Sequence, residues 1–158
     1  MAIGFEGDVV FRNLADNSNT KVEVDVLEGC SASFSPDKKL FAVASQLGYA
    51  RVWETATWRE VATLRGFLLG VHSVAFSGDG KRLATGSGNE EALKLWSTES
   101  WQEVLTLEGR GSMFWSTAFS PDGNAILAGN YTGIVHIWRA PSWAEINAAE
   151  KLASAPGP

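Results

Sequence analysis

The residues of this chain best suited to chemistry are two histidines, one cysteine and a pair of adjacent glutamates. His72 lies in GVHSVAF and His136 in IVHIW, and neither has the spacing of metal ligands to the other or to Cys30. We interpret His72 as a surface or loop residue and His136 as a structural one. A sole cysteine excludes an intrachain disulfide and a cysteine metal cluster. Glu90 and Glu91 are neighbours in a predicted turn, which is typical of a solvated loop. We therefore predict no metal site.

Motifs of nucleophilic, phosphate-binding and metal-dependent catalysis are missing from the sequence. It contains no GxSxG, GxxxxGKS, GxGxxG or HExxH. The stretch GSGNEEA has glycines but no lysine, and no predicted helix follows it, so a phosphate site is not expected. We predict that the chain is not an enzyme and has no catalytic residues and no cofactor.

Three series of residues instead recur at intervals of 42 or 43 residues. They are Trp53, Trp96 and Trp138; Trp58, Trp101 and Trp143; and Asp37, Asp79 and Asp122. Because three independent markers share one spacing, the chain contains an internal repeat.

Each repeat divides into short apolar segments at turn signals such as PDKK, GDGK and PDGN. The segments are too short and too β-branched for helices, so they predict strands. The expected strands are 31–35, 40–45, 50–54 and 60–64; 73–77, 82–87, 93–97 and 103–107; and 116–120, 125–130 and 134–138. The fold class is therefore all-β, with about three four-stranded antiparallel units, in each of which the fourth strand is the outer one.

Four antiparallel strands every 42–43 residues indicate β-propeller blades. The quoted segments AFSPDGNAILAGNYTGIVHIW, AFSGDGKRLATGSGNEEALKLW and SFSPDKKLFAVASQLGYARVW resemble the WD-repeat β-propeller family, in a degenerate bacterial type. The resemblance covers roughly Asp8 to Trp143, and the chain resembles the C-terminal end of a longer repeat region. It implies a propeller fold with a protein-interaction or scaffold function.

The repeats depart from the family pattern at its polar positions. The Gly-His pair is replaced by Gly66-Phe67 and Gly109-Arg110, and the aspartate after the third-strand tryptophan is missing. The hydrogen-bond network of strong family members therefore cannot form in full, and each blade is expected to depend more on apolar packing between neighbours.

The expected organisation is three blades with incomplete ends. Residues 1–29 are predicted to form an N-terminal half-blade of a third and a fourth strand, with Phe11 in the tryptophan position and no room before Asp8 for the matching first and second strands. Blade 1 covers 30–66 and blade 2 covers 67–109. Blade 3 covers 110–142 and lacks its own outer strand. Residues 143–158 are predicted to form a terminal helix or tail.

Three blades are too few to close a ring, so further blades must come from elsewhere. Two routes remain open: a longer parent protein, or a homo-dimer or homo-trimer. In the second route the segment Lys21–Glu28 is a candidate for donation to a neighbour's Ile134–Trp138 edge. Its inward side chains are Val22, Val24 and Val26.

The function predicted from these features is a non-catalytic interaction or scaffold module whose protein partner is unknown. Trp115 lies outside both tryptophan series, near one rim, and is a candidate interface residue together with Phe67, Leu68 and Leu69 in the GFLLG loop. The alternative is the sensory or scaffold C-terminal part of a bacterial serine/threonine kinase or other multidomain enzyme, because HIWRAPSWAEI resembles the end of such repeat regions. No kinase motif occurs in this chain.

Charge and hydropathy bear on the partners and the compartment. The net charge is −5 without a basic stripe, so nucleic acid is not an expected partner. No apolar run has the 18 or so residues of a membrane helix, so no membrane association is expected. The single cysteine favours a reducing, cytoplasmic location.

Overall fold

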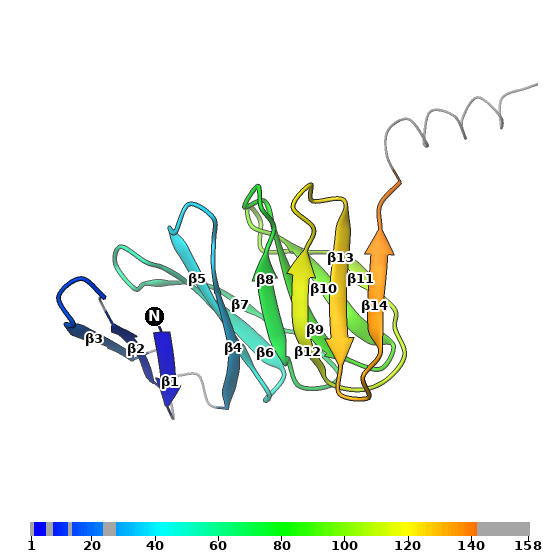
Figure 1. Cartoon of the computed structure of the whole chain (residues 1–158), viewed down its shortest axis with the longest axis horizontal. Coiled ribbons are helices and arrows are strands. Elements are labelled where there is room, and N and C mark those ends of the chain that lie inside the picture. The colour runs from blue at the N-terminus through cyan, green and yellow to red at the C-terminus, as the bar shows by residue number, and fades with distance from the viewer. Residues whose placement is uncertain (1, 6–7, 13, 24–27, 142–158) are drawn as a thin grey trace, which may run out of the picture.

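The computed structural model of the chain describes residues 2–5, 8–12, 14–23 and 28–141. Within these ranges the backbone forms fourteen strands in four antiparallel sheets, and no helix. Figure 1 shows the sheets side by side in chain order, from β1–β3 in blue to β12–β14 in yellow and orange. The all-β prediction is confirmed. No described segment forms a helix of the length and apolar character needed to cross a bilayer.

Two sheets are complete four-stranded blades in which spatial order follows chain order. Blade 1 consists of β4 (Gly29–Phe34), β5 (Leu40–Ser45), β6 (Tyr49–Glu54) and β7 (Glu60–Leu64). Blade 2 consists of β8 (Ser73–Phe76), β9 (Arg82–Gly88), β10 (Glu91–Ser97) and β11 (Glu103–Leu107). β5 and β9 are buried almost throughout because a neighbouring sheet covers each of their faces.

Blade 3 has three described strands: β12 (Phe114–Phe119), β13 (Ala125–Asn130) and β14 (Val135–Arg139). β14 pairs with β13 on one side, and no described strand pairs with its other edge. The terminal helix or tail predicted for 143–158 lies outside the described residues. All strand boundaries expected for the three blades agree with the structure to within two residues.

The N-terminal sheet contains one strand more than expected. β2 (Asp8–Arg12) and β3 (Asn19–Glu23) form a hairpin, and β1 (Ala2–Phe5) pairs with the other side of β2. The expectation that neither a first nor a second strand fits before Asp8 was therefore wrong for one strand, since β1 lies beside β2 as a second strand lies beside a third. Four residues suffice for a short strand, and this one pairs the backbone groups of β2 that would otherwise form an open edge.

Apolar side chains from facing sheets form three clusters between neighbours. Trp53, Trp96 and Trp138 each lie on the face that packs against the preceding sheet. Phe11, by contrast, packs forward against Phe34 and Phe41 of blade 1, with ring centroids 5.9 and 5.2 Å away. The prediction that Phe11 takes the tryptophan position was therefore wrong by one residue. The outer strand pairs of blades 1 and 2 contain a bulge beside Trp53 and Trp96, whereas β2 and β3 pair in continuous register. In a strand, a shift of one residue moves a side chain to the opposite face.

The recurring aspartates are structural residues in the turns between the first two strands of each blade. Ser35 Oγ donates to Asp37 Oδ1 and Ser77 Oγ to Asp79 Oδ1, each at 2.7 Å, and Ser120 donates to Asp122 in the same way. These hydrogen bonds hold the pKa of all three carboxyl groups below the usual value. The repeated FSxD motif therefore encodes a turn and is not a binding site.

Candidate interaction surface

One end of the blades carries most of the exposed large apolar side chains in loops. This end is formed by the turns between second and third strands and by the loops that lead into each blade. Its exposed members are Leu47, Leu68, Leu69, Met113, Tyr131 and Ile134 in loops and Trp115 at the start of β12, and we call these seven residues the apolar rim. The described residues of the opposite end include two counterparts, Leu14 in a turn and Phe34 at the end of β4, and the Phe34 ring also packs against Phe11 and Phe41. The two ends of the stack therefore differ sharply in polarity.

Backbone hydrogen bonds connect the turns of the apolar rim into a continuous row. The Val71 N–H donates to the Ser45 carbonyl at 3.0 Å, and the Asn89 N–H donates to the Gly111 carbonyl at 2.8 Å. At the far end, the Tyr131 N–H donates to the Met113 carbonyl at 3.1 Å. The first two bonds cross from one blade to the next and the third joins two loops of blade 3, so the rim is a single surface and not a set of independent loops.

The four predicted interface residues all lie at this end of the molecule. Leu68 is 82% exposed and Leu69 and Trp115 are 41% and 43% exposed. Phe67 is half-buried, because its ring packs 5.6 Å from that of Trp96 in the core between blades 1 and 2. Leu68, Leu69 and Trp115 are therefore available for contact, and Phe67 supports their loop from below.

Leu47 and Met113 lie in the loops SQLGY and EGRGSMF, which the sequence also suggests as contact loops, whereas Tyr131 was not anticipated as part of this surface. Their signal in the sequence is a large apolar residue within a turn, where polar residues are usual. Nothing in the one-dimensional pattern brings together positions that lie 84 residues apart, such as Leu47 and Tyr131.

His72 supports the rim from below. Only 6% of its surface is exposed, and its ring centroid lies 5.1 Å from that of Trp115. His72 is therefore a loop residue, as one of its two interpretations had it, but it is not a surface residue. The bulky Trp115 lies over the entry of β8, and the resulting burial lowers the pKa of His72.

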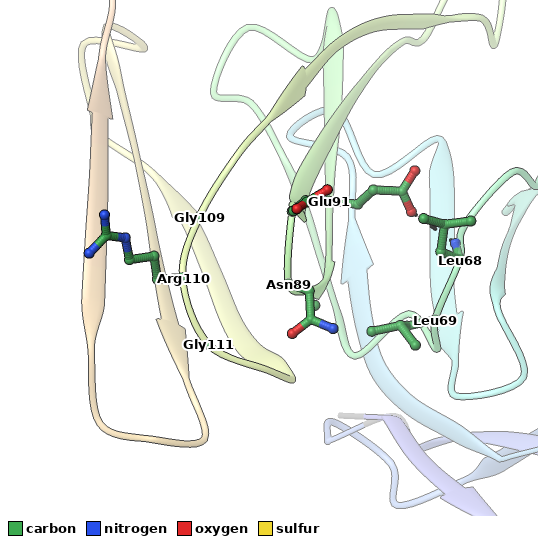
Figure 2. Close-up of a pocket in the computed structure, with 9 residues that line it drawn as sticks. Leu68, Leu69, Asn89, Glu91, Gly109, Arg110 and Gly111 are labelled. Atoms are coloured by element: carbon green, nitrogen blue, oxygen red, sulfur yellow. Dashed lines mark hydrogen bonds between the residues drawn. The ribbon is translucent and has the colours of Figure 1, made fainter.

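A hollow of about 630 Å³ opens in the apolar rim. Figure 2 shows Leu68 and Leu69 on one side of the Asn89–Glu91 turn and the Gly109–Gly111 loop on the other. In the same view the Arg110 side chain points away from Asn89 and Glu91. Gly109 has no space for a side chain, because an added Cβ would lie 2.6 Å from the Cβ of Ala92. The lining of the hollow thus combines the aliphatic side chains of Leu68 and Leu69 with the carboxylate of Glu91.

A buried lysine anchors the Leu68 loop beside this hollow. Lys94 Nζ lies 3.1 Å from Glu91 Oε1 and 2.9 Å from Glu103 Oε2, and Glu91 Oε2 accepts the Leu68 N–H at 2.8 Å. Burial opposes the charge of Lys94, but the two carboxylates outweigh it and raise the lysine pKa. The hydrogen bond from Thr106, together with Lys94, lowers the pKa of Glu103. Glu91 is thus interpreted as a positioning residue for the loop, in place of the solvated role expected from the sequence.

The outward face of blade 3 is a second exposed apolar surface. Val135 and Ile137 are 62% and 65% exposed there. The equivalent positions in the complete blades include Val52 and Leu93, which are 0% exposed because the next sheet packs over them. The face of blade 3 therefore has the composition of a blade interface without a covering sheet among the described residues.

The predicted strand-donation residues are only partly described. Val22 is 8% exposed and pairs with Val9 inside the N-terminal sheet. Val24 and Val26 lie outside the described residues. Donation of this segment would require β3 to give up its pairing with β2.

Comparison with known proteins identifies the repeat. The family profile "WD domain, G-beta repeat" matches residues 58–97 and 101–139, together half of the chain. The chain belongs to the WD40-repeat family. Each matched WD40 repeat starts just before an outer strand and ends with the third strand of the next blade, so each repeat links two sheets.

An uncharacterised WD repeat-containing protein from Nostoc sp. is 44% identical over 54 residues. The alignment covers 34% of this chain and spans 3% of the length of that relative. The relative supports the family assignment.

Proposed function

We propose that this WD40 chain is a non-catalytic protein-interaction module that binds its partner through the apolar rim. The observation that carries the proposal is the polarity difference between the two ends of the blades. Seven large apolar side chains are exposed on the rim, against Leu14 and Phe34 among the described residues of the opposite end. Exposed apolar patches of this kind usually mark interaction sites, and Leu68, Leu69 and Trp115 are the natural anchors.

Partner capture with two matched variants tests the rim. Leu68→Ser combined with Leu69→Ser changes the rim, and Leu14→Ser changes the opposite end as a control. We expect the full chain and the control to retain the same partner, quantified by mass spectrometry, and the rim variant to lose it at least tenfold. Equal capture by all three proteins would overturn the assignment of the rim.

We also propose that the outward face of blade 3 is covered by a further blade. The support is that Val135 and Ile137 occupy positions that are enclosed in blades 1 and 2. The covering blade comes from a longer parent protein or from a second copy of the chain. Two copies would stack about eight sheets, which lies within the range of closed propellers. Light scattering coupled to gel filtration distinguishes the routes, because self-completion requires a defined dimer or trimer.

A further inference from the structure

The hollow in the apolar rim has one aliphatic wall and one wall of bare backbone. Leu68 and Leu69 form the first wall, and Gly109 and Gly111 lie in the loop on the other side (Figure 2). Its volume of about 630 Å³ is within the range of ligand sites in proteins. A long side chain from another molecule can therefore enter the hollow and contact both walls.

Gly88 lies where the two walls of the hollow approach each other. A Cβ added to Gly88 would lie 3.1 Å from Leu69 Cδ1 and 3.2 Å from the backbone nitrogen of Met113. The lack of a side chain at this position therefore keeps the hollow open between the two residues. Because Leu69 and Met113 both belong to the apolar rim, apolar surface continues from the hollow on either side.

Three charged side chains line the hollow, and only one of them is free to pair with a ligand. Glu91 uses one carboxylate oxygen for Lys94 and the other for the Leu68 N–H. The Arg110 side chain points away from Glu91 (Figure 2). Glu90 is exposed, and its carboxylate has no ion pair or hydrogen bond with any described residue. The charge of Glu90 is therefore available to an incoming group.

The charged groups around the hollow carry a net negative charge. Lys94 Nζ lies 3.1 Å from Glu91 Oε1 and 2.9 Å from Glu103 Oε2, so two carboxylates already face one ammonium group. Glu90 adds a third carboxylate at the hollow itself. Like charges repel at this range, so the hollow disfavours an acidic peptide or a phosphate group and attracts a cation.

A long basic side chain has both properties that this lining requires. Lysine and arginine combine an aliphatic stem that packs along apolar surface with a cationic head that stays near water. The stem matches Leu68 and Leu69, and the head matches the carboxylate of Glu90. A purely apolar side chain would instead remove water from Glu90 without providing a compensating charge.

We propose that the hollow binds a lysine or arginine side chain of the protein partner, flanked in the partner by apolar residues. Glu90 pairs with the cation, Leu68 and Leu69 contact the aliphatic stem, and the flanking residues lie on the apolar rim around Met113. The proposal rests on the proposed binding of a partner through the apolar rim, and it names the chemistry of that partner. The net charge of −5 of the chain also favours the approach of a basic segment.

A titration of the full chain with matched peptides, followed by NMR, tests the proposal. The probe is the acetylated and amidated peptide Ala-Leu-Arg-Leu-Ala. Its control has citrulline, which is neutral and has the same shape, in place of arginine. We expect the probe to bind about fivefold more tightly, as for one exposed ion pair, and to shift the backbone amides of residues 88–91 and 109–111. The difference should shrink in about 1 M salt, because exposed charges are then screened.

Matched variants assign the charge preference to Glu90. Glu90→Gln should bind the probe and the citrulline peptide equally, and Glu90→Arg should prefer a peptide with glutamate in place of the arginine. Glu99→Gln and Glu99→Arg are the controls, because Glu99 is an exposed carboxylate in a turn at the opposite end of blade 2. Both controls should bind like the unmodified chain. Since Glu90 is exposed, its substitution should leave the melting temperature unchanged.

Three outcomes would overturn the proposal. Equal affinity for the probe and the citrulline peptide would show that the hollow does not select a charge. Absence of binding, or amide shifts confined to other residues, would show that the hollow does not receive the basic side chain. Equal affinity for the probe and for N-acetyl-arginine amide would indicate a site for small cations in place of a protein partner.

These outcomes are separable from a failure of the apolar rim itself. If Leu68→Ser with Leu69→Ser abolishes partner capture while the chain shows no preference for the charged peptide, the proposed function stands. In that case only the basic chemistry of the partner is contradicted. If the same double variant retains its partner, the rim and the inference drawn from it both fail.

Discussion

Blade 2 and blade 3 share one repeated pattern but differ in their surroundings. Leu93 in blade 2 is fully buried because blade 3 packs over it, whereas its counterpart Val135 in blade 3 is 62% exposed. Lys94 is satisfied by an outer strand, whereas the equivalent His136 has a buried nitrogen without a partner. The comparison shows that a blade becomes a stable unit through its neighbours, and that blade 3 has a face and an edge that no described residues cover.

The largest expected difference concerns the paired positions Leu93 and Val135. Leu93→Ala removes a side chain with no exposed surface and should lower the free energy of unfolding by about 2–5 kcal/mol. Val135→Ala should change it by less than about 0.5 kcal/mol, as exposed substitutions do. Urea denaturation measures both. A comparable loss in the two variants would mean that the face of blade 3 is covered in solution.

The ion pairs of Lys94 with Glu91 and Glu103 should produce the next largest effect on stability. Lys94→Met leaves two carboxylates without their cation and releases the Leu68 loop, so we expect a loss of about 1–3 kcal/mol. Arg51→Met is the matched control in blade 1, where the side chain is more exposed and the expected loss is below about 1 kcal/mol. Thermal melts of the two variants are the measurement, and the reverse order would contradict the importance of burial at Lys94.

The ion pair of Lys94 with Glu103 also predicts how stability depends on pH. The pKa of Lys94 is raised in the folded state, so its contribution is fully present below the ordinary lysine value of 10.5 and is lost as pH rises through the folded value. The pKa of Glu103 is lowered, so its contribution is present above the ordinary value of 4.5 and is lost as pH falls. Stability measured from pH 4 to 11 should decline at both ends, and Lys94→Met should remove the alkaline decline.

The open face of blade 3 should affect association more than stability. Ile137→Arg places a charge on a side chain that is 65% exposed, so the midpoint of unfolding should change little. If the chain completes its own ring, the variant should lose the dimer or trimer seen for the unmodified chain in light scattering. Ser100→Arg, in an exposed turn at the opposite end, is the control. An oligomer that survives Ile137→Arg would place the contact elsewhere.

The smallest effects are expected at the aspartate turns, where the two blades should not differ. Asp79 and Asp122 each accept a serine hydroxyl at the end of the blade remote from the apolar rim. Since the folded pKa of each is lowered, the stabilisation is present above the ordinary value of 3.8 and lost as pH falls below it. Asp79→Asn and Asp122→Asn should cost equally little at pH 7 and nothing at pH 2. A larger cost in blade 2 would show that these turns also depend on the neighbouring sheet.

The sequence alone determined the strands of the three blades, the repeat period of 42–43 residues and the WD40 family. Turn residues and short β-branched segments act locally, and their repetition at 42–43 residues makes the pattern unmistakable. Leu68 and Leu69 could also be chosen, because large apolar residues in loops are conspicuous without any knowledge of contacts, and Trp115 because it lies outside both tryptophan series.

Only the tertiary structure decided which faces and partners those residues have. Phe11 lies on the opposite face because the β2–β3 hairpin lacks the bulge of the other blades. Side chains alternate between the two faces of a strand, so a shift of one residue reverses the face. Glu91 became a loop anchor because the fold brings the Leu68 N–H, 23 residues away, to its carboxylate. The apolar rim and the burial of His136 Nδ1 without a partner among the described residues likewise depend on how the sheets stack, and a local sequence pattern contains no information about this.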